Sequence, residues 1–368
     1  MLTRLFALIK KELLASARDR QTRLVVLIAP PFLLLIYVFA ITQDVTNISL
    51  GVVDRDQGRY SREILDRVVG SSRFQEILYF ESEAELGAAI DAQRVLVGLH
   101  FQDGFSRRIL RRHSSNFQLL LDGRRSNAAQ IVSGYIYRIT ESYNLELLDE
   151  AGITMPTAVI SRTWFNANSE PLWSATPALF AVLASIVGFM VSALAIARER
   201  ELGTFEQLLV SPLTPFEILI GKTLPALLIA LASSAVMLAF SVFLLDVPLR
   251  GDLAALFLAM VVFLLSIIGI GLFISSVVRT QQQAVIGLFI YMIPAVLLSG
   301  YATPVANMPD WLQLVTQTNP ITHFIVICKG IFLKDLPASD IWAHTWPMIV
   351  IAIATLSIGT WLFNRRLE

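Results

Sequence analysis

The 368-residue sequence has little of what soluble enzymes depend on. It holds a single cysteine, Cys328, so an intramolecular disulfide is excluded. Histidine occurs four times, and the sequence contains no catalytic constellation of side chains. Charged residues make up only 16% of the chain, whereas hydrophobic residues make up 55% and the mean hydropathy is +0.63. Such a chain is too apolar for a soluble globular protein of this length.

Formal charge is absent from six long apolar runs. A helix needs roughly 20 apolar residues to cross the ~30 Å of hydrocarbon in a bilayer, and each run reaches that length. We therefore predict a polytopic α-helical membrane protein with six transmembrane helices. The runs are 24–43, 171–197, 223–245, 253–278, 280–309 and 341–364.

A polar block separates the first run from the second. Residues 42–170 hold 31 of the 58 charged side chains, namely 14 Arg and 17 Asp or Glu without any Lys. Strand and helix patterns alternate within this block, which predicts an inserted α/β domain over 44–170. The expected strands are 48–53, 74–80, 95–101 and 117–121, and the expected helices are 61–69, 82–93, 104–112 and 126–150.

Two groups of charges in this domain are candidates for function. Asp54 and Asp56 stand close enough in sequence to act as paired carboxylates, but their turn-rich surroundings favour a solvated turn. Four arginines share one predicted helix, where they would either grip an anionic partner or form a plain solvated face: Arg107, Arg108, Arg111 and Arg112.

Basic residues at both ends of the chain predict its orientation. Six of them precede the first run, which places the N-terminus in the cytoplasm by the positive-inside rule. Six spans return the C-terminus to the same side, where Arg365 and Arg366 follow the last run. The inserted domain then lies on the extracytoplasmic side. Residues 1–23 are expected to form an amphipathic interfacial helix, with one apolar face made of Leu2, Leu5, Phe6, Ile9 and Leu13.

Two alternatives affect this topology. Val38-Phe39-Ala40 resembles a signal-peptide cleavage site, but the run around it is long enough to span a membrane, so we expect an uncleaved helix over 24–43. The stretch 311–328 is also free of charge, but it is too polar for a seventh span exposed to lipid. We expect short outer helices near 303–335, broken at Asn319-Pro320.

The loop between the second and third runs has the densest local signal. The second run continues into Arg198–Glu201 and stops at Gly203, a residue suited to the left-handed conformation that ends helices. Thr204 and Gln207 form a capping box that starts a new helix, which Ser211-Pro212 ends. This pattern predicts a short, independently capped helix near 204–210.

A second capping box follows immediately. Thr214 occupies the N-cap position, with Pro215 at the first helical position and Glu217 at the third. The intervening helix is flanked by acidic residues, including Glu199 and Glu201, where a cytoplasmic loop is usually basic. A bare connector needs none of these features, so the loop is interpreted as a docking element for a soluble cytoplasmic partner.

The run from Glu199 to Leu213 resembles the signature loop of ABC-2 type transporter permeases, the membrane subunits of ABC exporters. The stretch 298–311, followed by Asn319-Pro320, is similar to the outer segment of that family between its fifth and sixth spans. Residues 171–368 match the family pattern throughout, and the large insert is typical of a subgroup of bacterial exporters. The outer motif comprises Ser299, Gly300, Pro304, Met308, Pro309, Trp311, Asn319 and Pro320.

The resemblance implies that 204–210 is a coupling helix seated in a groove of an ATP-hydrolysing subunit. It also implies an ATP-driven exporter of a hydrophobic or amphipathic substrate, such as a drug or a lipid, out of the cytoplasm or the inner leaflet. The residues expected to couple the chain to the ATPase are Glu199, Glu201, Gly203, Thr204, Phe205, Glu206, Gln207, Leu208, Leu209, Pro212, Thr214 and Glu217.

The partners follow from the same resemblance. Two ATPase subunits, which bind ATP and Mg, are expected to serve two permease subunits in a bacterial inner membrane, as a homodimer or a heterodimer. Membrane lipid and a periplasmic adaptor are further candidate partners, and nucleic acid is not. Gly221-Lys222-Thr223 looks like the end of a Walker A motif, but Phe216 stands where that motif needs a glycine. We therefore expect no cofactor in this chain.

Other functions fit the sequence less well. A secondary transporter usually places ionisable residues within its spans, and the central parts of the six runs hold none. His344 lies near the outer end of the last run and is interpreted as an interfacial residue. A membrane-anchored sensor needs only two spans, and a membrane enzyme would need a catalytic constellation. The substrate-lining residues stay unassigned.

Overall fold

The computed structural model describes residues 2–19, 24, 28–40, 48–71, 73–152, 165–166, 170–203 and 214–365. The chain divides into two compact units. The first unit combines Met1–Ile41 with Arg162–Glu368, and the second is Thr42–Ser161. The polar insert is therefore a structural unit separate from the apolar helices.

The first unit is a helical bundle. Among the described residues, four helices are long and apolar enough to cross a membrane, so the chain is a helical membrane protein. Shorter apolar helices, α3 and α12, fall within the first and fifth predicted runs, and the count of six spans stays a prediction. The long helices are α8 (Pro171–Glu201), α10 (Pro215–Ala239, continued by the π-helical turn η3, Phe240–Leu244), α11 (Leu253–Val277) and α15 (Ala338–Arg365); the shorter ones are α3 (Ala29–Ala40) and α12 (Gln281–Leu297).

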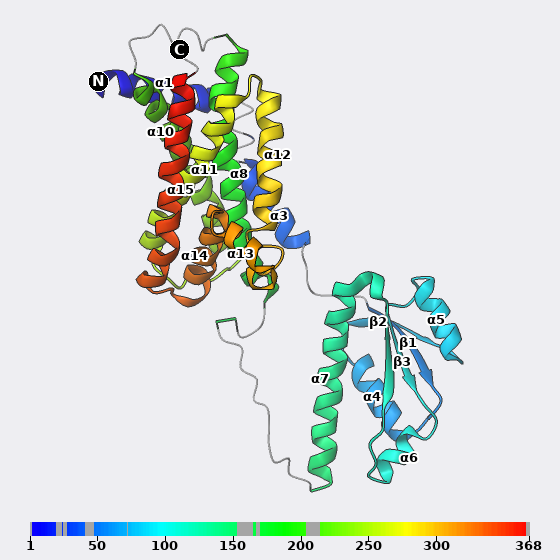
Figure 1. Cartoon of the computed structure of the whole chain (residues 1–368). Helices are drawn as coiled ribbons and strands as arrows, with labels where there is room; N and C mark the ends of the chain where they lie inside the picture. The colour runs from blue at the N-terminus through cyan, green and yellow to red at the C-terminus, as the bar shows by residue number, and fades with distance from the viewer. Residues whose placement is uncertain are drawn as a thin grey trace. The chain divides into compact units, whose positions relative to one another are not determined.

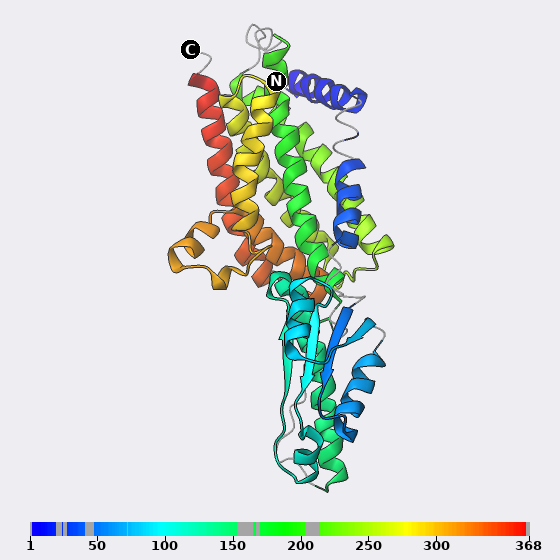
Figure 2. The ribbon, with the colours of Figure 1, turned by 90° about the vertical axis from the view of Figure 1, so that its right-hand side faces the viewer.

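Helices α8 and α11 form the centre of the bundle (Figures 1 and 2). They approach closely at Gly271, where an added Cβ would stand 2.0 Å from Oγ of Ser192. A second close contact joins α11 to α15 at Gly269, where an added Cβ would meet Oγ1 of Thr355 at 2.2 Å. Small residues that allow such approach are characteristic of helix packing within membranes.

The two ends of the bundle carry different elements. Helix α1 (Leu2–Arg18) lies across the end where α8 finishes and α10 begins (Figures 1 and 2). The opposite end holds the short turn η4 (Val305–Asn307) and helices α13 (Asp310–Thr316) and α14 (Pro320–Lys334). The stretch 311–328 thus contains two helices separated at Asn319, as the sequence predicted.

The second unit contains a four-stranded sheet in the order β2-β1-β3-β4. Strand β1 pairs in parallel with β2 and β3, and β4 runs antiparallel to β3. All four strands were expected from the sequence, although their ends differ by a few residues. They are β1 (Ile48–Asp54), β2 (Phe74–Tyr79), β3 (Val97–Phe101) and β4 (Phe117–Leu121).

Helices cover both faces of this sheet. Side chains of α4, α6 and α7 share one core with Leu50, Val52 and Leu99, whereas α5 packs on the other face. There Leu86 of α5 sits against Gly51 and Gly98, because a Cβ on either glycine would come within 2.7 Å of its methyl groups. The helices are α4 (Arg59–Val69), α5 (Glu83–Asp91), α6 (Phe105–Leu110) and α7 (Ser126–Glu150), with the 3-10 turn η2 (Gly123–Arg125) before α7.

The candidate carboxylates of this unit have structural roles. Oδ1 of Asp54 accepts the backbone N–H groups of Asp56 and Gln57, each at 3.0 Å. Asp56 in turn accepts the backbone N–H of Ser106, the second residue of α6, at 3.0 Å. The two carboxylates therefore fix a turn and a helix start, and the four arginines on and after α6 are exposed, in agreement with a solvated face.

Candidate coupling site

The last turn of α8 connects to four other helices of the bundle. Its last four residues are Arg198–Glu201. In order along the chain, they contact the residue after α1, then α1 and α10, then the end of α11, and then the start of α12. This turn ends immediately before the loop that the sequence identifies as the docking element. We refer to Arg198–Glu201 as the α8 junction.

An ion cluster with one exposed member, Lys11, and three largely buried members lies at the α8 junction. Nζ of Lys222 on α10 stands 2.7 Å from Oε1 of Glu199 and 2.8 Å from Oε1 of Glu12 on α1. Nζ of Lys11 lies 3.1 Å from the same oxygen of Glu199. The side chain of Lys222 is only 1% exposed. Two cations and two anions thus join α1, α8 and α10, and the cluster of Lys11, Glu12, Glu199 and Lys222 has no net charge.

Removing one member of this cluster would leave a buried charge without its counterpart, which is among the costliest changes a core can undergo. Burial and pairing have opposite effects on the pKa of Lys11. Burial lowers the pKa of its ammonium group, but the carboxylates of Glu199 and Glu12 outweigh burial, so this pKa lies above its ordinary value. The cluster therefore holds its three helices in one arrangement.

The remaining junction residues reach α1, α11 and α12. Arg198 pairs with Asp19, just after α1, at 3.0 Å. Arg200 donates to the backbone oxygens of Ser276 and Val278 at 3.0 and 2.8 Å, which satisfies carbonyl groups left free at the end of α11.

Glu201 contacts the N-terminal end of a helix, whereas Arg200 contacts a C-terminal end. Its Oε2 accepts hydrogen bonds from the backbone N–H and the side-chain amide of Gln281, at 3.0 and 3.1 Å, at the first residue of α12. A carboxylate is favourable at a helix N-terminus, where free N–H groups carry partial positive charge. The α8 junction therefore fixes the ends of α11 and α12 by complementary charge.

The structure confirms the predicted geometry on both sides of the loop. Gly203 follows the end of α8 with φ +70°, a conformation that side chains with a Cβ rarely adopt. On the far side, the hydroxyl of Thr214 accepts the N–H of Glu217, and the carboxylate of Glu217 accepts the N–H of Thr214 at 2.9 Å. Pro215 occupies the first position of α10.

The loop between these two ends lies outside the described residues. The predicted helix at 204–210 belongs to it, and its coupling role stays a prediction. The residues concerned are Thr204, Phe205, Glu206, Gln207, Leu208, Leu209 and Pro212. Glu199, by contrast, is buried and fixes helices within the subunit, and its part in coupling stays a prediction.

Residues of the outer motif act as caps and turns. Asn319 caps α14 by accepting the N–H of Ile321 at 3.1 Å, and its amide donates to the backbone oxygen of Ala295 on α12 at 2.6 Å. Ser299 is buried and accepts the N–H of Tyr301, while Gly300 adopts φ +82°. Pro320 is the buried first residue of α14. The other members lie around η4 and α13, where the side chain of Trp311 is exposed: Pro304, Met308, Pro309 and Trp311.

Two features of the site were not anticipated from the sequence. Gly221 allows α1 to touch α10, because an added Cβ would stand 2.2 Å from a methyl group of Leu8. Lys222 is a cluster member, although its surroundings suggested only a false nucleotide-binding motif. The signal available in the sequence was a lysine next to an apolar run, with glutamates at Glu12 and Glu199 able to neutralise it.

Comparisons with known proteins agree with one another. The profile of ABC-2 family transporter proteins matches residues 20–361. Over their full lengths, the chain is 41% identical to the probable multidrug ABC transporter permease YbhR of Escherichia coli K12. It is 28% identical to the probable multidrug ABC transporter permease YbhS of the same bacterium, covering 99% of this chain and 97% of that protein. The inner membrane transport permease YhhJ is 27% identical over 86% of this chain and 85% of its own length.

Proposed function

The chain belongs to the ABC-2 family of transporter proteins, and from this premise we propose that it is the permease subunit of an ATP-driven exporter. A separate ATPase chain supplies the energy. The segment 204–210 is the coupling helix that this ATPase contacts. The permease moves a hydrophobic or amphipathic molecule out of the cytoplasm or the inner leaflet.

One observation carries the proposal most strongly. The α8 junction ties the helix before the loop to α1, α10, α11 and α12. Thr214 and Glu217 fix the helix after the loop by a complete capping box. A force applied to the loop at its two ends would therefore reach most of the bundle through these contacts. Transmission of movement from an ATPase to the transmembrane helices requires such attachment.

The assembly follows from the need for an external energy source. Two ATPase subunits, each with ATP and Mg, would dock on two permease subunits, which form a homodimer or pair with a similar permease. Both termini of the permease face the cytoplasm, and the second unit lies outside the inner membrane of a bacterium. Two relatives are named as probable multidrug permeases, which supports a drug-like substrate.

The test separates ATP-driven export from ion-coupled transport. The chain is purified with any bound ATPase, reconstituted into liposomes, and supplied with a hydrophobic fluorescent dye and ATP. The proposal predicts that dye movement requires ATP and survives ionophores that remove proton and sodium gradients. Movement that ionophores abolish, or that proceeds without ATP, would identify a secondary transporter instead.

A further inference from the structure

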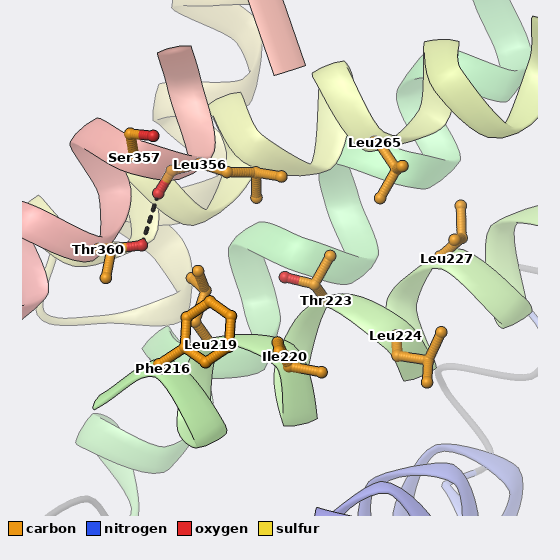
Figure 3. A pocket seen from close by; sticks show the side chains of 10 residues that line it. All are labelled: Phe216, Leu219, Ile220, Thr223, Leu224, Leu227, Leu265, Leu356, Ser357 and Thr360. Atoms are coloured by element: carbon orange, nitrogen blue, oxygen red, sulfur yellow. Dashed lines mark hydrogen bonds between the residues drawn. The ribbon is translucent and has the colours of Figure 1, made fainter. Parts of the chain in front are cut away.

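A lateral groove of about 290 Å³ runs between α10, α11 and α15 (Figure 3). Its rim includes the exposed side chains of Phe216, Leu224 and Ser357, so the groove opens away from the bundle. Leu227 and Leu265 line its far end. The groove is close to the low end of the roughly 300–1,000 Å³ that drug-sized ligands occupy, so it suits a slender molecule.

The polarity of the groove changes along its length. Figure 3 shows that the hydroxyl groups of Ser357 and Thr360 stand at the end of the groove near the start of α10, and that Thr223 stands between this end and the leucine-lined end. The latter end is lined by Leu224, Leu227 and Leu265. A ligand that fits this pattern has a polar group at one end and a hydrocarbon tail at the other.

The hydroxyl of Thr223 is the groove's unsatisfied group. Its Oγ1 is buried and has no hydrogen-bond partner among the described residues. Thr360, in contrast, donates to the backbone oxygen of Leu356 at 2.7 Å, as threonines in membrane helices commonly do. Thr223 lines the groove and its side chain is partly accessible, so a rotation about its Cα–Cβ bond would present the hydroxyl to an acceptor there. Because a buried hydroxyl without a partner is costly, such a hydrogen bond would stabilise the site.

The depth of the groove identifies the acceptor. Helix α1 lies across the bundle and contacts α10 at Gly221 and Lys222, and an amphipathic helix in this position marks the boundary between headgroups and hydrocarbon. Thr223 is the next residue on α10, so its hydroxyl stands near the level of lipid ester carbonyls. On α10 the groove extends over the twelve residues from Phe216 to Leu227, or about 16 Å, and its part from Thr223 to Leu227 lies deeper than the ester level.

We propose that this groove binds one phospholipid of the leaflet on the α1 side, with Thr223 donating a hydrogen bond to an ester carbonyl. The first part of one acyl chain then lies against Leu224, Leu227 and Leu265. The bound lipid fills the space between α10 and α15, the two helices that run to the same end of the bundle as the α8 junction. The site is independent of the substrate and of the ATPase.

A photoreactive lipid tests the proposal. The purified full chain is incubated in detergent with a phosphatidylethanolamine that carries a diazirine early in one acyl chain, illuminated, digested and mapped by mass spectrometry. Labelling is expected to concentrate on peptides containing 219–227 and 353–360. Unlabelled phospholipid should compete for it.

Matched variants make the test specific. Leu265→Phe grows into the groove and should lower labelling of these peptides at least fivefold, whereas Leu228→Phe, at an exposed position of α10 outside the groove, should leave it unchanged. Thr223→Val keeps the side-chain shape and should lower labelling about two- to tenfold through loss of one hydrogen bond. Melting temperatures confirm that each variant is folded.

Three results would overturn the proposal. Equal labelling in wild type and Leu265→Phe would show that the lipid does not occupy the groove. Unchanged labelling in Thr223→Val, with a higher melting temperature, would show that the Thr223 hydroxyl contacts only hydrocarbon and forms no hydrogen bond with the lipid. Displacement of the label by a transported dye, but not by phospholipid, would assign the groove to the substrate path.

Discussion

Lys222 is the residue whose environment departs most from the ordinary behaviour of its type. Lysine is almost never fully buried unless it is paired, and here its side chain is 1% exposed between Glu12 and Glu199. The resulting cluster joins α1 to both helices that flank the loop. The contribution of this lysine is therefore structural, beside the loop in which we propose the coupling helix.

Replacing Lys222 alone should be severely destabilising. Lys222→Met leaves two buried carboxylates facing only Lys11, and breaking a buried pair in this way costs about 3–5 kcal/mol. Thermal unfolding of the purified chain in detergent measures the loss. The double variant Glu199→Gln with Lys222→Met restores charge balance and should recover a large part of it. A single variant as stable as wild type would show that the cluster contributes nothing.

Asn319 permits a second test at the residue scale. Asn319→Ala removes the cap of α14 and the hydrogen bond to Ala295, and loss of a cap alone costs about 0.5–2 kcal/mol. The neighbouring Thr318→Ala is the control, because Thr318 is exposed and bonds only the backbone oxygen of Val315. Melting temperatures should fall clearly in the first variant and little in the second. Equal effects would contradict the assigned role of Asn319.

At the scale of elements, the sequence predicted helix bounds and caps well, because these depend on residues that are near one another in the chain. Helix α7 was expected over 126–150 and occupies Ser126–Glu150. The capping box predicted at Thr214 forms both of its hydrogen bonds. Caps and turns depend on residues three or four positions apart, which a sequence displays directly.

Contacts between distant segments could not be predicted in the same way. The bond between Lys222 and Glu12 joins positions 210 residues apart, and nothing in either neighbourhood specifies the other. The apolar face expected for α1 did not include Leu8, which is the residue that packs against Gly221. The groove beside Thr223 likewise depends on three helices whose arrangement is set by packing throughout the bundle.

The loop between α8 and α10 should uncouple transport when its predicted helix is altered. Alanine at Glu206, Gln207 and Leu208 together removes side chains expected to contact the ATPase, so ATP hydrolysis should no longer respond to the permease while the chain stays folded. Thr214→Ala, which weakens the adjacent cap by ~1 kcal/mol, should lower coupling only in part. Wild-type stimulation of hydrolysis in the triple variant would argue against a coupling helix here.

At the scale of the whole molecule, the second unit is separate in structure and rich in charge. We expect it to dock an adaptor or to form a vestibule over the exit. Replacing residues 48–160 by a short linker should leave the helical unit inserted and the ATPase bound, because the two units have separate cores. Export should be lost. Export at a normal rate would show that the unit has no part in the transport path.

Cross-linking in the native membrane can show whether the segment 204–210 contacts an ATPase. A photoreactive amino acid is placed at Gln207, with a control at Lys334 at the opposite end of the bundle, and cross-linked proteins are identified by mass spectrometry. The account predicts a cross-link from position 207, and none from position 334, to a chain that carries a complete Walker A motif. Failure of position 207 to capture any such chain, in membranes where export is active, would contradict it.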